Sequence, residues 1–307
     1  MKVVVFGASG VQGAAQVEAL ARSGKHNPVA VSRNPKPRRI DGKPIETLAA
    51  DFSNPADITK ALHGAEVLFL NLPSTSFQPG EPILAAAKNI AKEAAQTTTL
   101  QLVVFNTSMP VPTIKQDIVA QDHRRTIREL LREAGLPVIS IQPVAFLDNL
   151  LEGWALPLLV ERNTLVYCHK SDLQCSWICH ADLAKLMIAA IDRPDLAGSD
   201  LPVGGPETVT LEELAGKLSR AWGRPIAHEN QTVDDFCLTI SEAMEKRAGI
   251  NGDLIARQMH KAYTYYNNSP DRPFVIDMTP VLKELPVELT SIEDWARSNP
   301  LPSFVSA

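Results

Sequence analysis

The fold is decided by the first fifteen residues, Met1-Lys2-Val3-Val4-Val5-Phe6-Gly7-Ala8-Ser9-Gly10-Val11-Gln12-Gly13-Ala14-Ala15. An apolar run stops at a glycine cluster and is followed by a helical pattern, so the stretch predicts a buried strand, a tight turn and a helix. Glycines leave the main chain bare, and a helix start offers unpaired N–H groups and a positive dipole end to an anion. We therefore expect the diphosphate of a dinucleotide to bind here, at the six residues Gly7, Ser9, Gly10, Val11, Gln12 and Gly13.

The glycine spacing is G-x-x-G-x-x-G, which differs from the dehydrogenase fingerprint G-x-G-x-x-G. The alternative is a structural loop whose glycines coincide with a binding pattern. The position of the triplet between an apolar strand and a helix favours the dinucleotide site.

Length and composition fit a globular protein of one large domain or two unequal ones, since 45% of the 307 residues are hydrophobic. The formal charge of −5 argues against bulk attraction to nucleic acid or to anionic lipid. No apolar run is long enough to span a bilayer, and the first one ends at Gly7, too early for a signal peptide. These features predict a cytoplasmic protein with no nucleic-acid or membrane partner.

Strand and helix patterns alternate through the first half of the chain, which predicts an α/β fold of the Rossmann type with a doubly wound parallel sheet. Further strands are expected at residues 28–32, 45–52, 65–73, 100–108 and 136–143, and helices at 56–62, 82–96 and 122–134. We assign residues 1–150 to an NAD(P)-binding domain.

Residues 151–307 are more irregular and are assigned to a smaller C-terminal α/β substrate lobe, with some segments returning to the first domain. Strand-like pieces at 165–169 and 174–179 mix there with helical patterns at 181–191, 211–222 and 253–266. No repeat or low-complexity linker separates the two parts, so we expect them to share one core.

The choice between NADP and NAD depends on the residues directly after the strand at residues 28–32. An NAD-specific fold places an acid about 20 residues beyond the glycines, whereas Arg33 stands there and no acid follows it until Asp41. Because a guanidinium can pair with a 2′-phosphate, we predict NADP(H), with NAD(H) as the alternative. Lys36, Arg38 and Arg39 are interpreted as loop charges, and a solvated basic loop is the alternative for the whole cluster.

Other cofactor contacts are expected where strands end, on the ligand side of the sheet. Asp51 is predicted either to accept a hydrogen bond from the adenine amine or to cap the following turn. Asn71, Leu72 and Pro73 should pass beside the nicotinamide half of the cofactor.

Three of the four cysteines, Cys168, Cys175 and Cys179, lie close to His169 and His180 and raise the question of a metal. Their spacing lacks the C-x-x-C pairs of zinc sites and alternates like one face of a strand. We therefore predict buried free thiols and no metal site.

Together these residues resemble the NmrA-like family of atypical short-chain dehydrogenases/reductases. The resemblance is carried by Val5 to Gly13, Ser32-Arg33, Ala50-Asp51-Phe52, Gly135-Leu136-Pro137, Gln142-Pro143 with Phe146 and Asn149, Trp177-Ile178 with Asp182, and Leu289-Thr290-Ser291 with Trp295. It implies a Rossmann-type domain with a smaller substrate lobe, and it adds Phe52, Pro143 and Phe146 to the expected cofactor site. Members bind NADP(H) or NAD(H); some reduce quinones, dyes or phenylpropanoid-like substrates, and others are redox-sensing regulators without turnover.

One departure concerns the proton donor. Short-chain dehydrogenases that reduce simple carbonyls use Tyr-x-x-x-Lys, but the first tyrosine of this chain is Tyr167. Where reductases of the NmrA-like type often keep a lysine, counting back from Gly135 leads to Arg124. An arginine can stabilise an oxyanion but does not give up its proton near neutrality, whereas the neighbouring His123 can.

The sequence supports two functions as hypotheses. The first is an NADPH-dependent reductase of a quinone or other conjugated acceptor, in which Arg124 stabilises charge, His123 or water gives the proton and Ser108 hydrogen-bonds the acceptor. For these three side chains, exposed or purely structural roles are the alternative. The second hypothesis is a nicotinamide-binding redox sensor that acts through a protein partner. Residues 263–266 either line an aromatic pocket or pack into the core, and the sequence leaves monomer or homodimer open.

Overall fold

The centre of the fold is β1 (Lys2–Phe6), which pairs in parallel with a strand on each side. The computed structural model describes residues 1–248 and 252–302; residues 249–251 and 303–307, which belong to the predicted second lobe, lie outside the described part. The sheet has eight strands in the order β3-β4-β2-β1-β5-β6-β7-β9. Their bounds are β2 (Asn27–Ser32), β3 (Arg38–Ile40), β4 (Lys43–Ala49), β5 (Val67–Asn71), β6 (Leu102–Asn106), β7 (Val138–Pro143) and β9 (Asp200–Val203).

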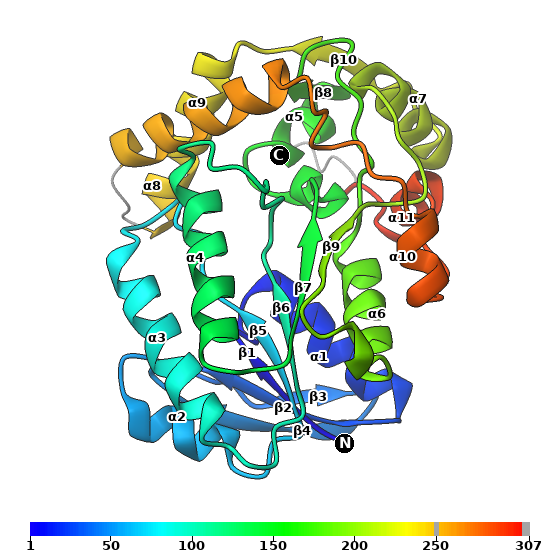
Figure 1. Ribbon diagram of the computed structural model, residues 1–307. Helices are drawn as coiled ribbons and strands as arrows, with labels where there is room; N and C mark the ends of the chain where they lie inside the picture. The colour runs from blue at the N-terminus through cyan, green and yellow to red at the C-terminus, as the bar shows by residue number, and fades with distance from the viewer. Residues whose placement is uncertain (249–251, 303–307) are drawn as a thin grey trace.

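Helices cover both faces of this sheet, as the alternating pattern predicted (Figure 1). Val3 and Val5 pack in one core cluster with residues of α1 (Val11–Ser23) and α6 (His180–Ile191). Val4 and Phe6 point the other way, into a cluster with α2 (Pro55–Leu62), α3 (Glu81–Ala95) and α4 (Val119–Glu133). Side chains of a strand alternate between faces, so the unbroken apolar run of β1 reflects burial on both sides.

The later chain forms a cap beyond the carboxyl ends of the strands (Figure 1). Its elements are α5 (Leu156–Glu161), β8 (Thr164–Tyr167), α7 (Leu211–Trp222), β10 (Ala227–Asn230), α8 (Val233–Ala248), α9 (Gly252–Asn268), α10 (Thr279–Glu284) and α11 (Ile292–Ser298). Short 3₁₀ turns lie at Leu147–Leu151 and Pro194–Leu196. One core cluster runs from β1 into this cap, and α6 and β9 return to the sheet. The two parts therefore share a core, as expected, while the boundary at residue 150 stays a prediction.

The strand expected at residues 174–179 is wrong. Cys175 and Ile178 form only isolated bridges, to Val209 and to Phe146. The main chain of this segment also bonds to a third neighbour: the N–H of Ser176 donates to the carbonyl oxygen of Phe274. The alternation of apolar residues there reflects burial on one side and does not reflect pairing along one partner strand.

The structure has a hairpin at the edge of the sheet that the sequence does not predict. β3 pairs antiparallel with β4, and Arg38 and Arg39 lie in it, where a loop was expected. β4 ends at Ala49, before Asp51. Short edge strands rich in charge carry little periodic signal, which explains the omission.

The cysteines are free and buried, as predicted. Among residues 1–248 and 252–302, no group of three or more His, Cys, Asp or Glu side chains could hold a metal ion. In the same ranges, the structure has no helix that is both long and apolar enough to cross a membrane.

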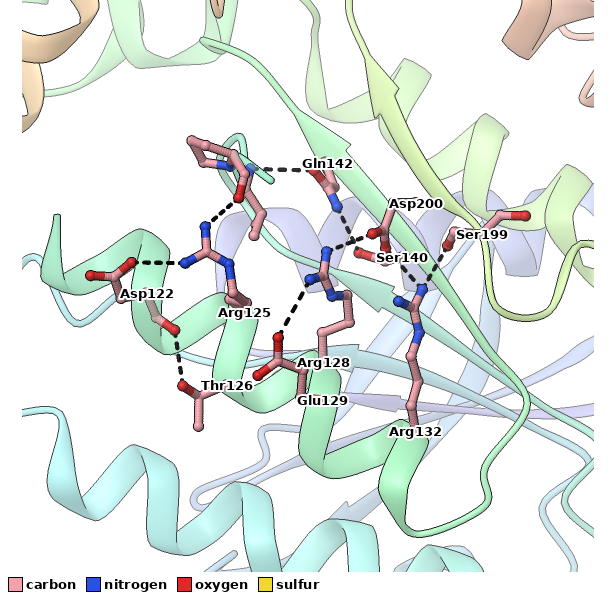
Figure 2. A network of polar contacts seen from close by, with 12 residues as sticks. Asp122, Arg125, Thr126, Arg128, Glu129, Arg132, Ser140, Gln142, Ser199 and Asp200 are labelled. Atoms are coloured by element: carbon pink, nitrogen blue, oxygen red, sulfur yellow. Dashed lines mark hydrogen bonds and ion pairs between the residues drawn. The ribbon is translucent and has the colours of Figure 1, made fainter. Parts of the chain in front are cut away.

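The edge strand β9 is fastened to α4 by arginines that project from one side of that helix (Figure 2). Nη1 of Arg128 lies 2.6 Å from Oδ2 of Asp200, and Nη2 of Arg132 lies 2.8 Å from Oδ1 of the same carboxylate. Arg132 also donates to the carbonyl oxygen of Ser199. One acid thus neutralises two largely covered guanidinium groups and holds the last strand in register.

We expect Asp200→Ala to lower the free energy of unfolding by about 2 kcal/mol, because two charged hydrogen bonds are lost and both arginines stay partly buried. Glu129→Ala is the matched control, since this carboxylate is 3.8 Å from Arg128 and half exposed, and we expect it to cost less than about 0.5 kcal/mol. Urea denaturation of both variants measures the difference. Equal losses would contradict the role given to Asp200.

Candidate functional site

The turn between β1 and α1 packs main chain against main chain. Gly7 has φ +76°, and a Cβ atom there would lie 2.5 Å from the carbonyl oxygen of Asn71. A Cβ on Gly13 would lie 2.4 Å from the carbonyl oxygen of Gly7. Both positions therefore require glycine. Gly10 caps α1 without a side-chain acceptor, so the first N–H groups of the helix are left for an anion.

A cavity of about 380 Å³ lies over this turn. Its walls unite most of the residues that the sequence assigned to the cofactor: Gly7, Ser9, Gly10, Val11, Gln12, Gly13, Asn71, Leu72 and Pro73, with Ser108 beside them. The structure thus brings the glycine turn and the end of β5 to one hollow.

A second cavity, of about 430 Å³, shares Ser9 with the first and runs along the end of β2. Ser32, Asn34, Lys36 and Arg38 line it, so two charges interpreted as loop residues face this hollow. Arg33 is exposed between two lining residues and is not itself in the wall. The place expected for a 2′-phosphate therefore has three cations near it: Arg33, Lys36 and Arg38. The guanidinium of Arg38 already lies 3.4 Å from the carboxylate of Glu18.

Besides Arg33, the predicted cofactor residues Asp51, Phe52, Pro143 and Phe146 lie outside the walls of these two cavities. Oδ1 of Asp51 accepts the N–H of Ser53 at 2.9 Å, which is the turn-capping alternative, and this bond lowers the pKa of the exposed carboxyl. Phe52 stacks on Phe6 with ring centroids 4.5 Å apart. Pro143 is buried at the end of β7. Their assignment to the cofactor stays a prediction.

A continuous row of amide side chains lies beneath the first cavity. Gln16 and Asn71 exchange two hydrogen bonds, of 2.8 and 2.7 Å. Nδ2 of Asn106 donates to Oδ1 of Asn71 and to Oε1 of Gln12, at 2.9 and 2.6 Å. Nε2 of Gln12 then donates to Oγ of Ser108 at 2.6 Å. The row connects α1 with the carboxyl ends of β5 and β6 and ends at Ser108.

A third cavity, of about 210 Å³, adjoins the first and shares Gln12, Ser74, Phe77 and Ser108 with it. Its far wall is aromatic: Phe146 follows β7, and the cap contributes Tyr167, Tyr263, Tyr266 and Phe274. Phe146, predicted as a cofactor residue, therefore faces this hollow. The two alternatives for residues 263–266 both hold in part, because Tyr263 and Tyr266 pack against neighbouring rings and also line the cavity.

The tyrosine hydroxyls of this wall are held by hydrogen bonds. The hydroxyl groups of Tyr167 and Tyr263 are 3.2 Å apart, and Nε2 of Gln121 donates to the hydroxyl of Tyr266 at 2.9 Å. Burial raises the pKa of Tyr263 and of Tyr266, so both phenols stay neutral hydrogen-bond donors at physiological pH.

His123 and Arg124 are not in the walls of the cavities. Arg124 is 1% exposed, and its Nη2 donates to the carbonyl oxygen of Leu72 at 2.8 Å. Burial lowers the pKa of Arg124 to about 10. Nδ1 of His123 lies 3.0 Å from Oγ1 of Thr75, and burial lowers the pKa of the imidazole. Both side chains hold the segment that follows β5, and their catalytic roles stay predictions.

Sequence reasoning missed several residues that the geometry brings to the site. Asn106 ends β6 as Asn71 ends β5, so a polar residue closing an apolar strand was the available signal. Gln16, Gln121 and Phe274 gave no signal, because their contacts join segments far apart in the sequence.

The chain is similar in sequence to one protein family and to known reductases. A model of the NmrA-like family matches residues 1–296. Over 233 residues the chain is 26% identical to (4-alkanoyl-5-oxo-2,5-dihydrofuran-3-yl)methyl phosphate reductase of Streptomyces griseus subsp. griseus, covering 76% of this chain and 78% of that protein. Over 264 residues it is 24% identical to NAD(P)H azoreductase of Xenophilus azovorans, covering 85% of this chain and 86% of that protein.

Solved structures show the same fold. The NADPH-dependent quinone oxidoreductase QOR2 of Escherichia coli, in complex with NADPH, aligns with a TM-score of 0.72 at 19% identity, covering 97% of this chain and 99% of that one. NmrA, a negative transcriptional regulator in complex with NAD, aligns with a TM-score of 0.73 at 16% identity, covering 96% and 94%. At such identities the likeness establishes the Rossmann-type fold.

We expect Arg33→Asp to raise the Kd for NADPH at least about tenfold while changing the Kd for NADH less than about threefold, because a carboxylate repels a 2′-phosphate. Arg39→Asp is the control, because the guanidinium of the exposed Arg39 donates to the carbonyl oxygen of Gly42 in its own hairpin. Fluorescence titration measures both affinities. Equal effects on the two cofactors in Arg33→Asp would remove Arg33 from the phosphate, and the same titration of Lys36→Asp and Arg38→Asp then shows which cation takes its place.

Proposed function

The chain belongs to the NmrA-like family, and from that premise we propose that it is an NADPH-dependent oxidoreductase that passes hydride to a quinone-like or other conjugated acceptor. NADH serves as the alternative donor. The substrate is a small molecule, and no nucleic-acid or membrane partner takes part.

The observation that carries the proposal is the junction of two cavities. The cavity over the glycine turn and the aromatic cavity meet at Gln12, Ser74, Phe77 and Ser108. A nicotinamide bound beside Leu72 and Pro73 would lie at this junction, and a planar acceptor among the tyrosines would stack within reach of it. Binding in both hollows brings donor and acceptor together.

The polar groups of the junction suit a conjugated acceptor. Hydride transfer to a simple ketone yields a strongly basic alkoxide, which needs a proton donor. Transfer to a quinone yields a delocalised phenolate, which hydrogen bonds stabilise and water protonates. Ser108 and Tyr266 offer neutral hydroxyls in the aromatic cavity. The absence of Tyr-x-x-x-Lys is then no obstacle to turnover.

Two residues of α4 have a holding role in this scheme. Arg124 donates to the Leu72 carbonyl oxygen and so fixes the segment expected beside the nicotinamide. His123 contacts Thr75 in the same segment. We assign proton delivery to water, with His123 as the alternative that the sequence suggested.

The relatives support this choice of reaction. The names of the two curated relatives describe reductases, one of an azo compound and one of an unsaturated lactone phosphate. The quinone oxidoreductase of Escherichia coli shares the fold and binds NADPH. The regulator NmrA shares it too and binds NAD, so the second candidate is a redox sensor that acts through a protein partner.

We expect the protein to oxidise NADPH with 1,4-naphthoquinones and azo dyes, and to reduce cyclohexanone at least about 100-fold more slowly for lack of a general acid. Absorbance of NADPH at 340 nm measures the rates, and the protein-free reaction is the control. No turnover with any conjugated acceptor, together with unequal affinities for NADP⁺ and NADPH, would replace the reductase with the sensor.

A further inference from the structure

At one end of the amide row, a main-chain atom fixes which amide atom donates a hydrogen bond and which accepts one. Nδ2 of Asn71 lies 3.0 Å from the main-chain carbonyl oxygen of Phe6. A carbonyl oxygen only accepts hydrogen bonds, so the amide nitrogen of Asn71 must face it and Oδ1 must face the other way. Asn71 therefore presents an acceptor to Asn106.

The opposite end is fixed as well. The main-chain N–H of Ser108 donates to Oδ1 of Asn106 at 2.9 Å. A main-chain N–H only donates, so Nδ2 of Asn106 faces Asn71 and Gln12 and donates to both. The two assignments, made from different main-chain atoms, agree at the contact between Asn71 and Asn106.

These donor and acceptor assignments determine whether the Ser108 hydroxyl accepts or donates its hydrogen bond to Gln12. Oε1 of Gln12 accepts from Asn106, so Nε2 of Gln12 is the atom that faces Oγ of Ser108, at 2.6 Å. Oγ must accept this bond, and within residues 1–248 and 252–302 no other hydrogen bond takes the hydroxyl proton. Ser108 lies where the cofactor and aromatic cavities meet. Its proton is therefore available to a molecule bound there.

The backbone of Ser108 is also unusual. Its φ of +65° lies in the left-handed region, which residues other than glycine seldom adopt. Such conformations persist where surrounding contacts over-determine them, often at functional sites. Here the bonds from the main-chain N–H to Asn106 and from Gln12 to Oγ supply that constraint.

We propose that Asn71, Asn106 and Gln12 are positioning residues that fix Ser108 as a hydrogen-bond donor to the oxygen of the acceptor. The inference rests on the proposed function. As two electrons and one proton leave NADPH as hydride, negative charge develops on the acceptor oxygen, and the Ser108 hydroxyl donates a hydrogen bond to it. No bond of Ser108 breaks, since water supplies the proton that completes the reduced acceptor.

Replacing the donating amide of Asn106 with a carboxyl, which only accepts hydrogen bonds once ionised, tests the proposal. Asn106 is 2% exposed, and no charged side chain of the described residues hydrogen-bonds to Asn71, Asn106 or Gln12. In Asn106→Asp, the introduced carboxyl should therefore have a raised pKa. While neutral it accepts from the Ser108 N–H and donates its single O–H hydrogen bond to Oε1 of Gln12, in place of the two bonds of the amide. Once ionised, the carboxylate only accepts hydrogen bonds. The Gln12 amide then flips, so that Nε2 donates to the carboxylate and Oε1 accepts a hydrogen bond from the Ser108 hydroxyl.

We expect kcat of Asn106→Asp to fall about 100-fold as pH rises through the pKa of the introduced carboxyl, the loss typical of removing an oxyanion donor. KM for NADPH should change little. Ser108→Ala should show the same loss at every pH, and adding Asn106→Asp to it should change nothing further. Asn299→Asp, at the end of α11, is the matched charge control. A variant whose pH profile follows the wild type would overturn the proposal.

A binding measurement separates this proposal from the proposed function. 4-Nitrophenolate presents a phenolate oxygen that accepts hydrogen bonds, and its visible absorbance reports binding to protein loaded with NADP⁺. We expect Ser108→Ala, and Asn106→Asp at high pH, to weaken this binding about tenfold relative to Asn299→Asp, the value of one charged hydrogen bond. That pattern without turnover would keep the positioning role and reject the reductase. Turnover with unchanged binding and unchanged kcat in both variants would reject the positioning role alone.

Discussion

The structure depends on a turn in which two positions have no room for a side chain. Gly13 packs on the carbonyl oxygen of Gly7, and Gly7 packs on that of Asn71. Only this close approach lets the first turn of α1 lie directly over the carboxyl ends of β5 and β6. Gln12 and Gln16 then reach Asn71 and Asn106, and the bare N–H groups open into the cavity above. Cofactor cavity and amide row thus have one origin.

α4 fastens the opposite side of the site. Arg124 holds the carbonyl oxygen of Leu72, Arg125 holds that of Pro112, and Gln121 holds the hydroxyl of Tyr266. These contacts join the segments after β5 and β6 to the cap. α4 therefore holds these segments in place, and the hydroxyls that face the aromatic cavity come from other elements.

The features that could be predicted from the sequence are those that arise within one local segment. The apolar run, the glycine turn and the strand-ending Asn71 could be placed because their signals are short-range, and the glycine turn and Asn71 do line one cavity. Counting back from Gly135 singled out Arg124 as a candidate. The burial of this side chain could not be predicted, because it depends on which face of α4 packs against the sheet. The amide row joins residues 94 positions apart, and the bond from Gln121 to the aromatic wall joins residues 145 positions apart, so no local pattern reports these contacts.

The central claim is that a nicotinamide dinucleotide binds against the bare main chain of the first turn. Calorimetric titration of cofactor-stripped protein with NADPH, for wild type and Gly10→Val, tests it most directly. A Cβ at Gly10 has only an ordinary contact, 3.4 Å from the carbonyl oxygen of Gly7, and its extended backbone accepts valine. We predict one site per chain in wild type, and affinity at least about tenfold weaker in Gly10→Val at an unchanged Tm. No heat with NADPH or NADH, or equal binding by the two proteins, would contradict the account.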